Sequence, residues 1–418
     1  MERTETHIRR NIVICADGTG NTYVGRPSNA ARIVDLLAMD DPERQTVVYD
    51  QGIGTDARSW RELTRRAAVE PGLAHLHVLP GPHESWFPPA TRWNLVRGLA
   101  TGAGLRENVQ QMYEWLAARY RGEKDRIYLF GFSRGAFTVR ALAGVMFRCG
   151  LSDQPGAFDT AWRLYEPMQA DKAAVTAFWR EAQPRRCPVH FLGLWDTVKS
   201  YGGLRPVMLP HLRHNPSVRT VCHAMALDEH RGWFDATTWG WLDHDQGRDA
   251  APASNAFAAA RLDDETKDAL ARQAIDEVWF SGSHSDVGGG NGNDATADIA
   301  LAWMLAEAVH ADVALSTAGV TFLQRSTEGD VPVVTDSHTR WWRLVERVRR
   351  STIDNSGEWP MAVEGVVGPA DRKPGQLLRD GRAAFHRTAL TTPTGVGVRR
   401  VGTRRDSALA LARGPAGG

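Results

Sequence analysis

The stretch RIYLFGFSRGAFTVRALAGVM, Arg126 to Met146, predicts a strand, a sharp turn and a helix in direct succession. Its β-branched and aromatic start favours a buried strand, and the small and apolar residues after Gly135 follow helical spacing. The turn between them reads G-x-S-x-G, with Ser133 at its centre. In this context the motif is typical of a nucleophile elbow, in which Gly131 and Gly135 make room for a strained backbone that presents the serine hydroxyl.

The same alternation of strand and helix begins near the N-terminus. The short apolar runs NIVICA, residues 11–16, and TVVY, residues 46–49, are expected to be strands buried on both faces. Between them, Ser28 is expected to cap a helix. This β-α-β order predicts an α/β fold with a mostly parallel sheet and helices on both faces.

Later segments continue the pattern. Residues 105–121 and 295–309 have apolar side chains at helical spacing, and residues 189–195 (VHFLGLW) and 277–280 (EVWF) are expected to be strands. We also predict a helix over residues 218–231.

Other segments interrupt this pattern and suggest the domain organisation. The Trp- and Pro-rich residues 56–101 are interpreted as an insertion over the sheet edge, either a substrate lid or a packed excursion. Residues 151–186 and 200–274 are expected to be cap-like segments. We predict a catalytic domain over residues 9–310 and a C-terminal extension over residues 311–418 that ends in a partly flexible tail.

Composition limits the class of protein. The 418 residues include 50 Lys and Arg against 49 Asp and Glu, so no overall basic field favours nucleic acid. The four cysteines are scattered without a C-x-x-C pair, which fits synthesis in a reducing compartment. The polar N-terminus lacks a signal-peptide core. We therefore expect a chain that is cytoplasmic as synthesised, with any export by a signal-independent secretion system.

Polar side chains follow several of the predicted strands at their carboxyl ends, where parallel sheets bind their ligands. The chain order Ser, Asp, His is one in which Ser-His-Asp triads occur. We expect Ser133 to be the nucleophile, His284 the general base and Asp196 the acid that orients the imidazole. The residues at strand ends are Asp17, Ser133, Asp196 and His284.

Other residues compete for two of these roles. His386 is the best substitute for His284. Asp228 and Asp286 are the alternatives to Asp196, although neither follows a strand as directly. Three further histidines are expected to have structural roles: His190, His223 and His230.

A tetrahedral oxyanion needs two preorganised N–H donors. The amide of Arg134, directly after the serine, is expected to be one of them. The second is expected from Gly18 and Thr19, which follow the first strand. We expect Asp17 to order this loop by accepting backbone N–H groups.

The chain resembles the bacterial and fungal α/β-hydrolase family that includes the type VI secretion phospholipase effectors. The resemblance runs from about Asn11 to about Ala308, apart from residues 56–101. It implies an esterase in which Ser133, Asp196 and His284 form the triad, and characterised members cleave phospholipid acyl esters. The matching segments, in order, are ICADGTGN, VVYDQGIGT, YLFGFSRGAFTVRALAGVM, FLGLWDTV, HAMALDEHR and VWFSGSHSDVGGG.

We therefore predict a serine hydrolase that cleaves carboxylic esters of lipids or phospholipids through an acyl-enzyme, without a cofactor or metal. Its expected partners are the ester substrate, a membrane surface, and a secretion or immunity protein that the sequence does not identify. The alternatives are a non-catalytic binding module on a hydrolase fold, or a metal-dependent phosphatase or nuclease. The residues that would gather around the ion in the latter are Asp17, Asp196, His284 and Asp286.

Overall fold

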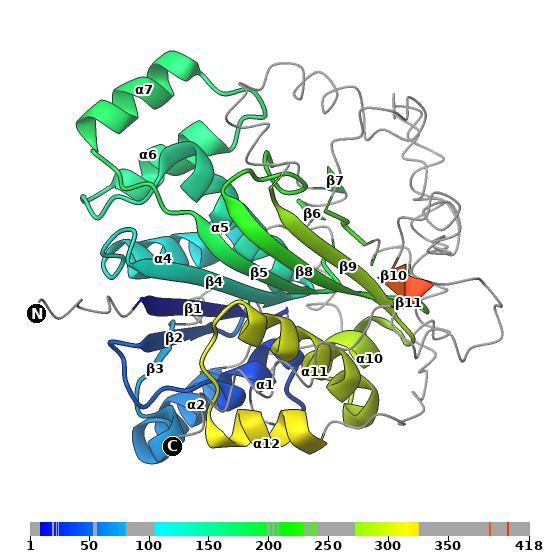
Figure 1. The fold of residues 1–418 in the computed structure, drawn as a ribbon. Coiled ribbons are helices and arrows are strands. Elements are labelled where there is room, and N and C mark those ends of the chain that lie inside the picture. Colours follow the sequence, from blue (N-terminus) through cyan, green and yellow to red (C-terminus); the bar gives the residue numbers. More distant parts are fainter. Residues whose placement is uncertain are drawn as a thin grey trace, which may run out of the picture.

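A parallel β-sheet runs through the middle of the molecule, and helices cover both of its faces (Figure 1). The strand order is β11-β10-β9-β8-β5-β4-β1-β2-β3. This arrangement is the α/β class that the sequence predicts. In this computed structural model the described residues are 9–52, 57–80, 104–198, 201–239, 272–325, 384–385 and 399–400, apart from short gaps at 19–20, 22, 24, 203–204, 207–208, 230, 232–233 and 235.

All pairs in this sheet are parallel. A separate antiparallel pair is formed by β6 (Tyr201–Gly202) and β7 (Arg205–Pro206). The strands of the main sheet are β1 (Arg10–Ala16), β2 (Gln45–Asp50), β3 (Leu76–Val78), β4 (Asp125–Phe132), β5 (Val189–Trp195), β8 (Val218–Ala226), β9 (Ala274–Phe280), β10 (Ala384–Phe385) and β11 (Arg399–Arg400).

The helices form two layers, with α4 to α7 on one face of the sheet and α1, α2, α10, α11 and α12 on the other (Figure 1). No helix among the described residues is both long enough and apolar enough to cross a bilayer. Their bounds are α1 (Asn29–Leu36), α2 (Ala57–Val69), the 3₁₀ turn η1 (Pro71–Leu73), α4 (Leu105–Ala117), α5 (Arg134–Cys149), α6 (Ala157–Tyr165), α7 (Lys172–Glu181), α10 (His284–Gly288), α11 (Asp294–His310) and α12 (Thr317–Arg325).

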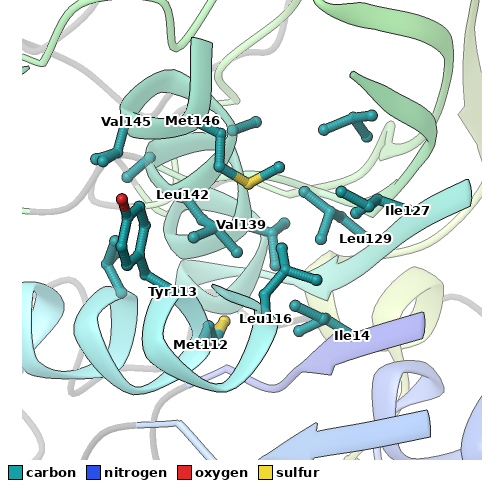
Figure 2. Close-up of a cluster of buried hydrophobic side chains, with 14 of the residues drawn as sticks. Ile14, Met112, Tyr113, Leu116, Ile127, Leu129, Val139, Leu142, Val145 and Met146 are labelled. Carbon is teal, nitrogen blue, oxygen red and sulfur yellow. The ribbon is translucent and has the colours of Figure 1, made fainter. Parts of the chain in front are cut away.

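Each face of the sheet has its own apolar core, because successive side chains of a strand point to opposite faces. Ile14 of β1 belongs to one core with residues of α4 and α5, and Figure 2 shows Leu116 of α4 beside it. Val13 and Cys15 of the same strand point into the other core, with α1 and α11. The central strands are therefore apolar on both faces, which explains their continuous apolar sequences.

The elbow between β4 and α5 brings backbones into direct contact. A Cβ atom added to Gly135 would lie 2.2 Å from the carbonyl oxygen of Ala16, and one added to Gly131 would lie 2.6 Å from Cα of Ala136. Ser133 adopts φ 58° and ψ −119°, a conformation that L-residues rarely occupy. Gly135 is needed because α5 starts against the carboxyl end of β1, and Gly131 is needed because the end of β4 lies against the first turn of α5.

The predicted helix over residues 218–231 is wrong. Residues Val218–Ala226 form strand β8, which lies between β5 and β9. A strand covered on both faces has no polar side, so its apolar residues carry no period-2 pattern that separates it from a buried helix. In the pairing of β8 with β9, His223 lies opposite Glu277.

The start of the predicted insertion at residue 56 also needs correction. Helix α2 and strand β3 continue the β-α-β order, and β3 pairs in parallel with β2 as an edge strand. Residues 81–103 of that segment lie outside the described residues. At the other predicted boundary, residue 310, the chain continues into α12, whose Leu323 is buried in the core beneath α1.

Replacing Gly135 by alanine tests the contact between α5 and β1. The added Cβ would meet backbone atoms, which cannot yield as a flexible side chain can, so we expect the free energy of unfolding to fall by about 1–3 kcal/mol or more. Gly72→Ala is the matched control, because no atom lies within 4 Å of a Cβ built there. Urea denaturation measures both, and a Gly135→Ala midpoint equal to the wild-type value would contradict the prediction.

Candidate functional site

Ser133 is at the junction of β4 and α5, at the carboxyl edge of the sheet. Its amide donates a hydrogen bond to the carbonyl oxygen of Trp195, the last residue of β5, at 3.0 Å. The residue is 7% exposed. The elbow is thus tied to the end of the neighbouring strand, and the Ser133 hydroxyl lies above that edge.

Asp196 directly follows β5 and is fully buried. Its amide donates to the carbonyl oxygen of Ala224 at 2.7 Å, and its Oδ1 accepts from the amide of Ala226 at 3.0 Å. Its backbone has a φ of 38°, which is unusual for a residue other than glycine. Strand β8 therefore holds both the backbone and one carboxylate oxygen of Asp196.

His284 connects these two residues. Its Nδ1 lies 2.6 Å from Oδ2 of Asp196, and its Nε2 lies 2.8 Å from Oγ of Ser133. Because a carboxylate only accepts, Nδ1 carries the proton that is donated to Asp196, and the Nε2 lone pair faces the serine hydroxyl. The structure thus brings Ser133, His284 and Asp196 together within hydrogen-bond distance.

Two aromatic rings enclose the imidazole of His284. The ring of Phe132 lies 4.6 Å from it, centroid to centroid, and the ring of Phe234 lies 4.8 Å away, edge to face. Burial lowers the pKa of His284 below its ordinary value of 6.5, and the hydrogen bond to Asp196 opposes this shift only in part. The imidazole is therefore neutral and able to accept a proton near neutral pH.

A buried ion pair supports the backbone of His284. Oε2 of Glu229 accepts from the amide of His284 at 3.2 Å. Arg231 binds both oxygens of Glu229, at 2.9 and 2.7 Å, and its guanidinium stacks on the ring of Phe234 at 3.8 Å. These residues were not predicted as site residues, although Glu229 and Arg231 belong to the motif HAMALDEHR and Phe234 follows it closely.

The two alternatives to Asp196 serve the loop around His284 and do not bind its ring. Oδ2 of Asp286 accepts from both the amide and the hydroxyl of Ser283, each at 2.9 Å. Asp228 accepts from the amide of Gly282 at 2.6 Å. Both carboxylates therefore order the turn that carries His284.

Asp17 has four hydrogen-bond donors around a buried carboxylate. Oδ1 accepts from the amide of Gly18 at 2.6 Å and from Ser28 Oγ at 2.7 Å, while Oδ2 accepts from the Tyr49 hydroxyl at 2.7 Å. Asn21 is the fourth donor, at 3.0 Å. Burial raises the pKa of Asp17 despite these bonds. Asp17 orders the loop after β1, mainly through side-chain donors.

The prediction of Gly18 as an N–H donor to an oxyanion needs correction. Its N–H is directed to the carboxylate of Asp17, so it is not directed at Ser133. The Gly18 backbone nevertheless lies against Ser133, since an added Cβ would come 3.0 Å from the serine Cβ. Thr19 lies outside the described residues, and Arg134 begins α5 directly after the serine.

The residues of the metal-site alternative do not gather at one point in the described part of the chain. Asp17 and Asp286 are each occupied by their own loops. The described ranges contain one group of three side chains spaced to hold an ion, and it joins β8, β9 and α11 away from Ser133. Its members are Cys222, Asp276 and Glu307.

Among the competing histidines that the structure describes, His190 is not part of this site. His190 lies at the start of β5, at the opposite edge of the sheet, where it lines a groove of about 860 Å³ with Arg126 and Arg219. His230 and His386 lie outside the described residues.

Comparison with known proteins gives a family and several relatives. The family model described as "T6SS, Phospholipase effector Tle1-like, catalytic domain" matches residues 10–307. The uncharacterized protein YEL023C of Saccharomyces cerevisiae is 30% identical over 238 residues, which are 54% of this chain and 32% of the yeast protein.

Two solved structures are also similar. An uncharacterized protein from Pseudomonas aeruginosa has 19% identity and a TM-score of 0.37, over 73% of this chain and 46% of the other. The Tle1 effector bound to the VgrG spike of the type 6 secretion system has 17% identity and a TM-score of 0.30, over 68% of this chain and 51% of the other. This chain thus spans between 32% and 51% of the length of these relatives.

Asp286→Ala tests the support of the turn that carries His284. The change leaves the buried amide of Ser283 without its acceptor, so we expect the free energy of unfolding to fall by about 1–3 kcal/mol. Asp40→Ala is the control, because Asp40 is exposed. Thermal unfolding measures the effect. Equal melting temperatures for the two variants would mean that Asp286 does not stabilise this turn.

Proposed function

The chain belongs, through residues 10–307, to the family of type VI secretion Tle1-like phospholipase effector catalytic domains, and from this premise we propose that it hydrolyses phospholipid acyl esters with Ser133 as nucleophile. The observation that carries the proposal is the continuous pair of hydrogen bonds from Ser133 Oγ to His284 Nε2 and from His284 Nδ1 to Asp196 Oδ2, at 2.8 and 2.6 Å. The family supports a lipid as the substrate.

In the proposed reaction, Ser133 Oγ attacks the ester carbonyl carbon while His284 Nε2 takes the hydroxyl proton. Asp196 stabilises the imidazolium that forms. The tetrahedral intermediate collapses, the ester C–O bond breaks, and His284 returns the proton to the departing alcohol. A water molecule, deprotonated by His284, then attacks the acyl carbon. The bond between this carbon and Ser133 Oγ breaks, His284 returns the proton to Oγ, and the fatty acid is released.

The negative charge of the tetrahedral oxygen requires N–H donors beside Ser133. We assign the first to the amide of Arg134, at the N-terminus of α5, where backbone N–H groups point away from the helix. The loop after β1 supplies the second, with Thr19 as its candidate. In comparable sites the loss of one donor costs about 3 kcal/mol of transition-state stabilisation.

The surroundings of the triad suggest a division of the remaining tasks. Residues 9–310 would form the catalytic unit, and the part of the predicted 56–101 insertion that follows β3 would be either a substrate lid or a packed excursion. Delivery would need no cleavable signal, as the family name implies. The solved Tle1 effector is bound to a VgrG spike, and for this chain a spike or an immunity protein is a proposed partner.

Ser133→Ala is the decisive variant. A fluorophosphonate should label the wild-type chain at Ser133 and should not label the variant, and ester hydrolysis should fall by about 10⁴-fold or more because the nucleophile is lost. The assay compares a short acyl ester, a triglyceride and phospholipid vesicles, with and without EDTA.

Ser316→Ala, at the start of α12, is the matched control and should behave as wild type. Hydrolysis that is lost with EDTA but kept in Ser133→Ala would instead favour a metal-dependent phosphatase or nuclease. Biological activity that survives in Ser133→Ala would favour a binding module.

The pH dependence of hydrolysis follows from His284. Proton transfer needs the neutral imidazole, so activity should be lost as the pH falls through the pKa of this residue. Because burial lowers that pKa, the acidic limb of kcat/KM should have its midpoint below 6.5. Rates between pH 4 and pH 9 test this, and a midpoint above 6.5 would contradict it.

A further inference from the structure

A second buried histidine–carboxylate pair lies beneath the proposed triad. His223 of β8 is fully buried and faces Glu277 of β9 in the sheet register. Its Nδ1 lies 2.9 Å from Oε1 of Glu277. Burying an imidazole and a carboxylate is unfavourable unless their polar atoms form hydrogen bonds. The hydrogen-bond partners of His223 and Glu277 therefore indicate which parts of the backbone this pair holds.

The other ring nitrogen of His223 is bonded to the residue that follows the triad acid. Its Nε2 accepts from the amide of Thr197 at 3.1 Å. An imidazole that accepts at Nε2 carries its proton on Nδ1, which it donates to Glu277. Burial lowers the pKa of His223 and favours this neutral form, although Glu277 and Asp196 oppose the shift.

The amide of Thr197 matters because it belongs to the peptide unit directly after Asp196. Asp196 has a φ of 38°, a conformation that persists only where its surroundings enforce it. On its other side, the carbonyl oxygen of Thr197 accepts from the amide of Thr237 at 2.8 Å. The backbone after Asp196 is therefore fixed at both ends of Thr197.

Glu277 also binds the segment that contains Trp239. Its Oε1 also accepts from the amide of Trp239 at 2.6 Å. Arg140 of α5, the third charged group that faces His223, stacks on Trp239 with its guanidinium 5.4 Å from the ring. Trp239 follows Phe234 in the chain, and the ring of Phe234 packs on His284.

We propose that His223 and Glu277 form a positioning pair that acts through Thr197 to orient the carboxylate of Asp196 toward His284. The inference rests on the proposed triad and goes beyond it, because neither residue contacts the reacting atoms. The pair should affect kcat and leave KM nearly unchanged, since it serves the transition state and not substrate binding.

The test uses His223→Leu, which removes the acceptor for Thr197, and His223→Gln, which offers a carbonyl oxygen in its place. We expect His223→Leu to lower kcat and the fluorophosphonate labelling rate by about 10–100-fold, as supporting residues of polar sites do. KM should stay within about 3-fold, and His223→Gln should recover most of the loss. His190→Leu, on the opposite edge of the sheet, is the matched control and should behave as wild type.

A double-mutant cycle separates positioning from general stability. In an Asp196→Asn background His223→Leu should change the labelling rate by less than about 3-fold, because the carboxylate that it orients is absent. An equal loss in both backgrounds, or no loss in either, would overturn the inference while the proposed function stands. A wild-type chain that is not labelled at all would overturn both.

The tautomer of His223 gives a second test, which uses the wild-type chain and does not depend on whether a variant folds. Imidazole ¹⁵N shifts of the wild-type chain should show the proton on Nδ1 of His223. A proton on Nε2 would exclude acceptance from Thr197 and would overturn the inference even if His223→Leu does not fold.

Discussion

The backbone contact between the start of α5 and the end of β1 is the constraint on which the site depends. Helix α5 can begin at Arg134 only because Gly135 lies against the carbonyl groups of Ala16 and Asp17 without a side chain. This approach forces Ser133 into its strained conformation and points its hydroxyl away from the core. Packing energy from the apolar face of α5 holds the strain in place (Figure 2).

Neighbouring strand ends are joined to one another by backbone hydrogen bonds. The amide of Ser133 donates to the end of β5, the amide of Asp196 donates within β8, and the amide of Leu227 donates to the end of β9. Each loop is thus fixed to the next strand along the sheet. The side chains of three distant segments meet at hydrogen-bond distance because the sheet is parallel and its carboxyl ends share one edge.

The two histidine–carboxylate pairs differ in the group that meets the Nε2 atom of the imidazole. Both imidazoles have a lowered pKa from desolvation and a carboxylate at Nδ1. His284 has a serine hydroxyl at Nε2, whereas His223 has a backbone amide there. The same chemical unit thus meets a side-chain hydroxyl in one place and a backbone amide in the other.

The amino-acid sequence alone determined the α/β class, most of the strands and the positions of Ser133, Asp196 and His284 at strand ends, because local periodicity and turn chemistry are encoded within a few residues. It did not separate strand β8 from a helix, since burial on both faces removes the pattern. Only the tertiary structure decided that Glu229 and Arg231 support His284 and that His223 faces Glu277. These are contacts between segments far apart in the chain, and no local pattern specifies which distant residue will occupy the neighbouring strand.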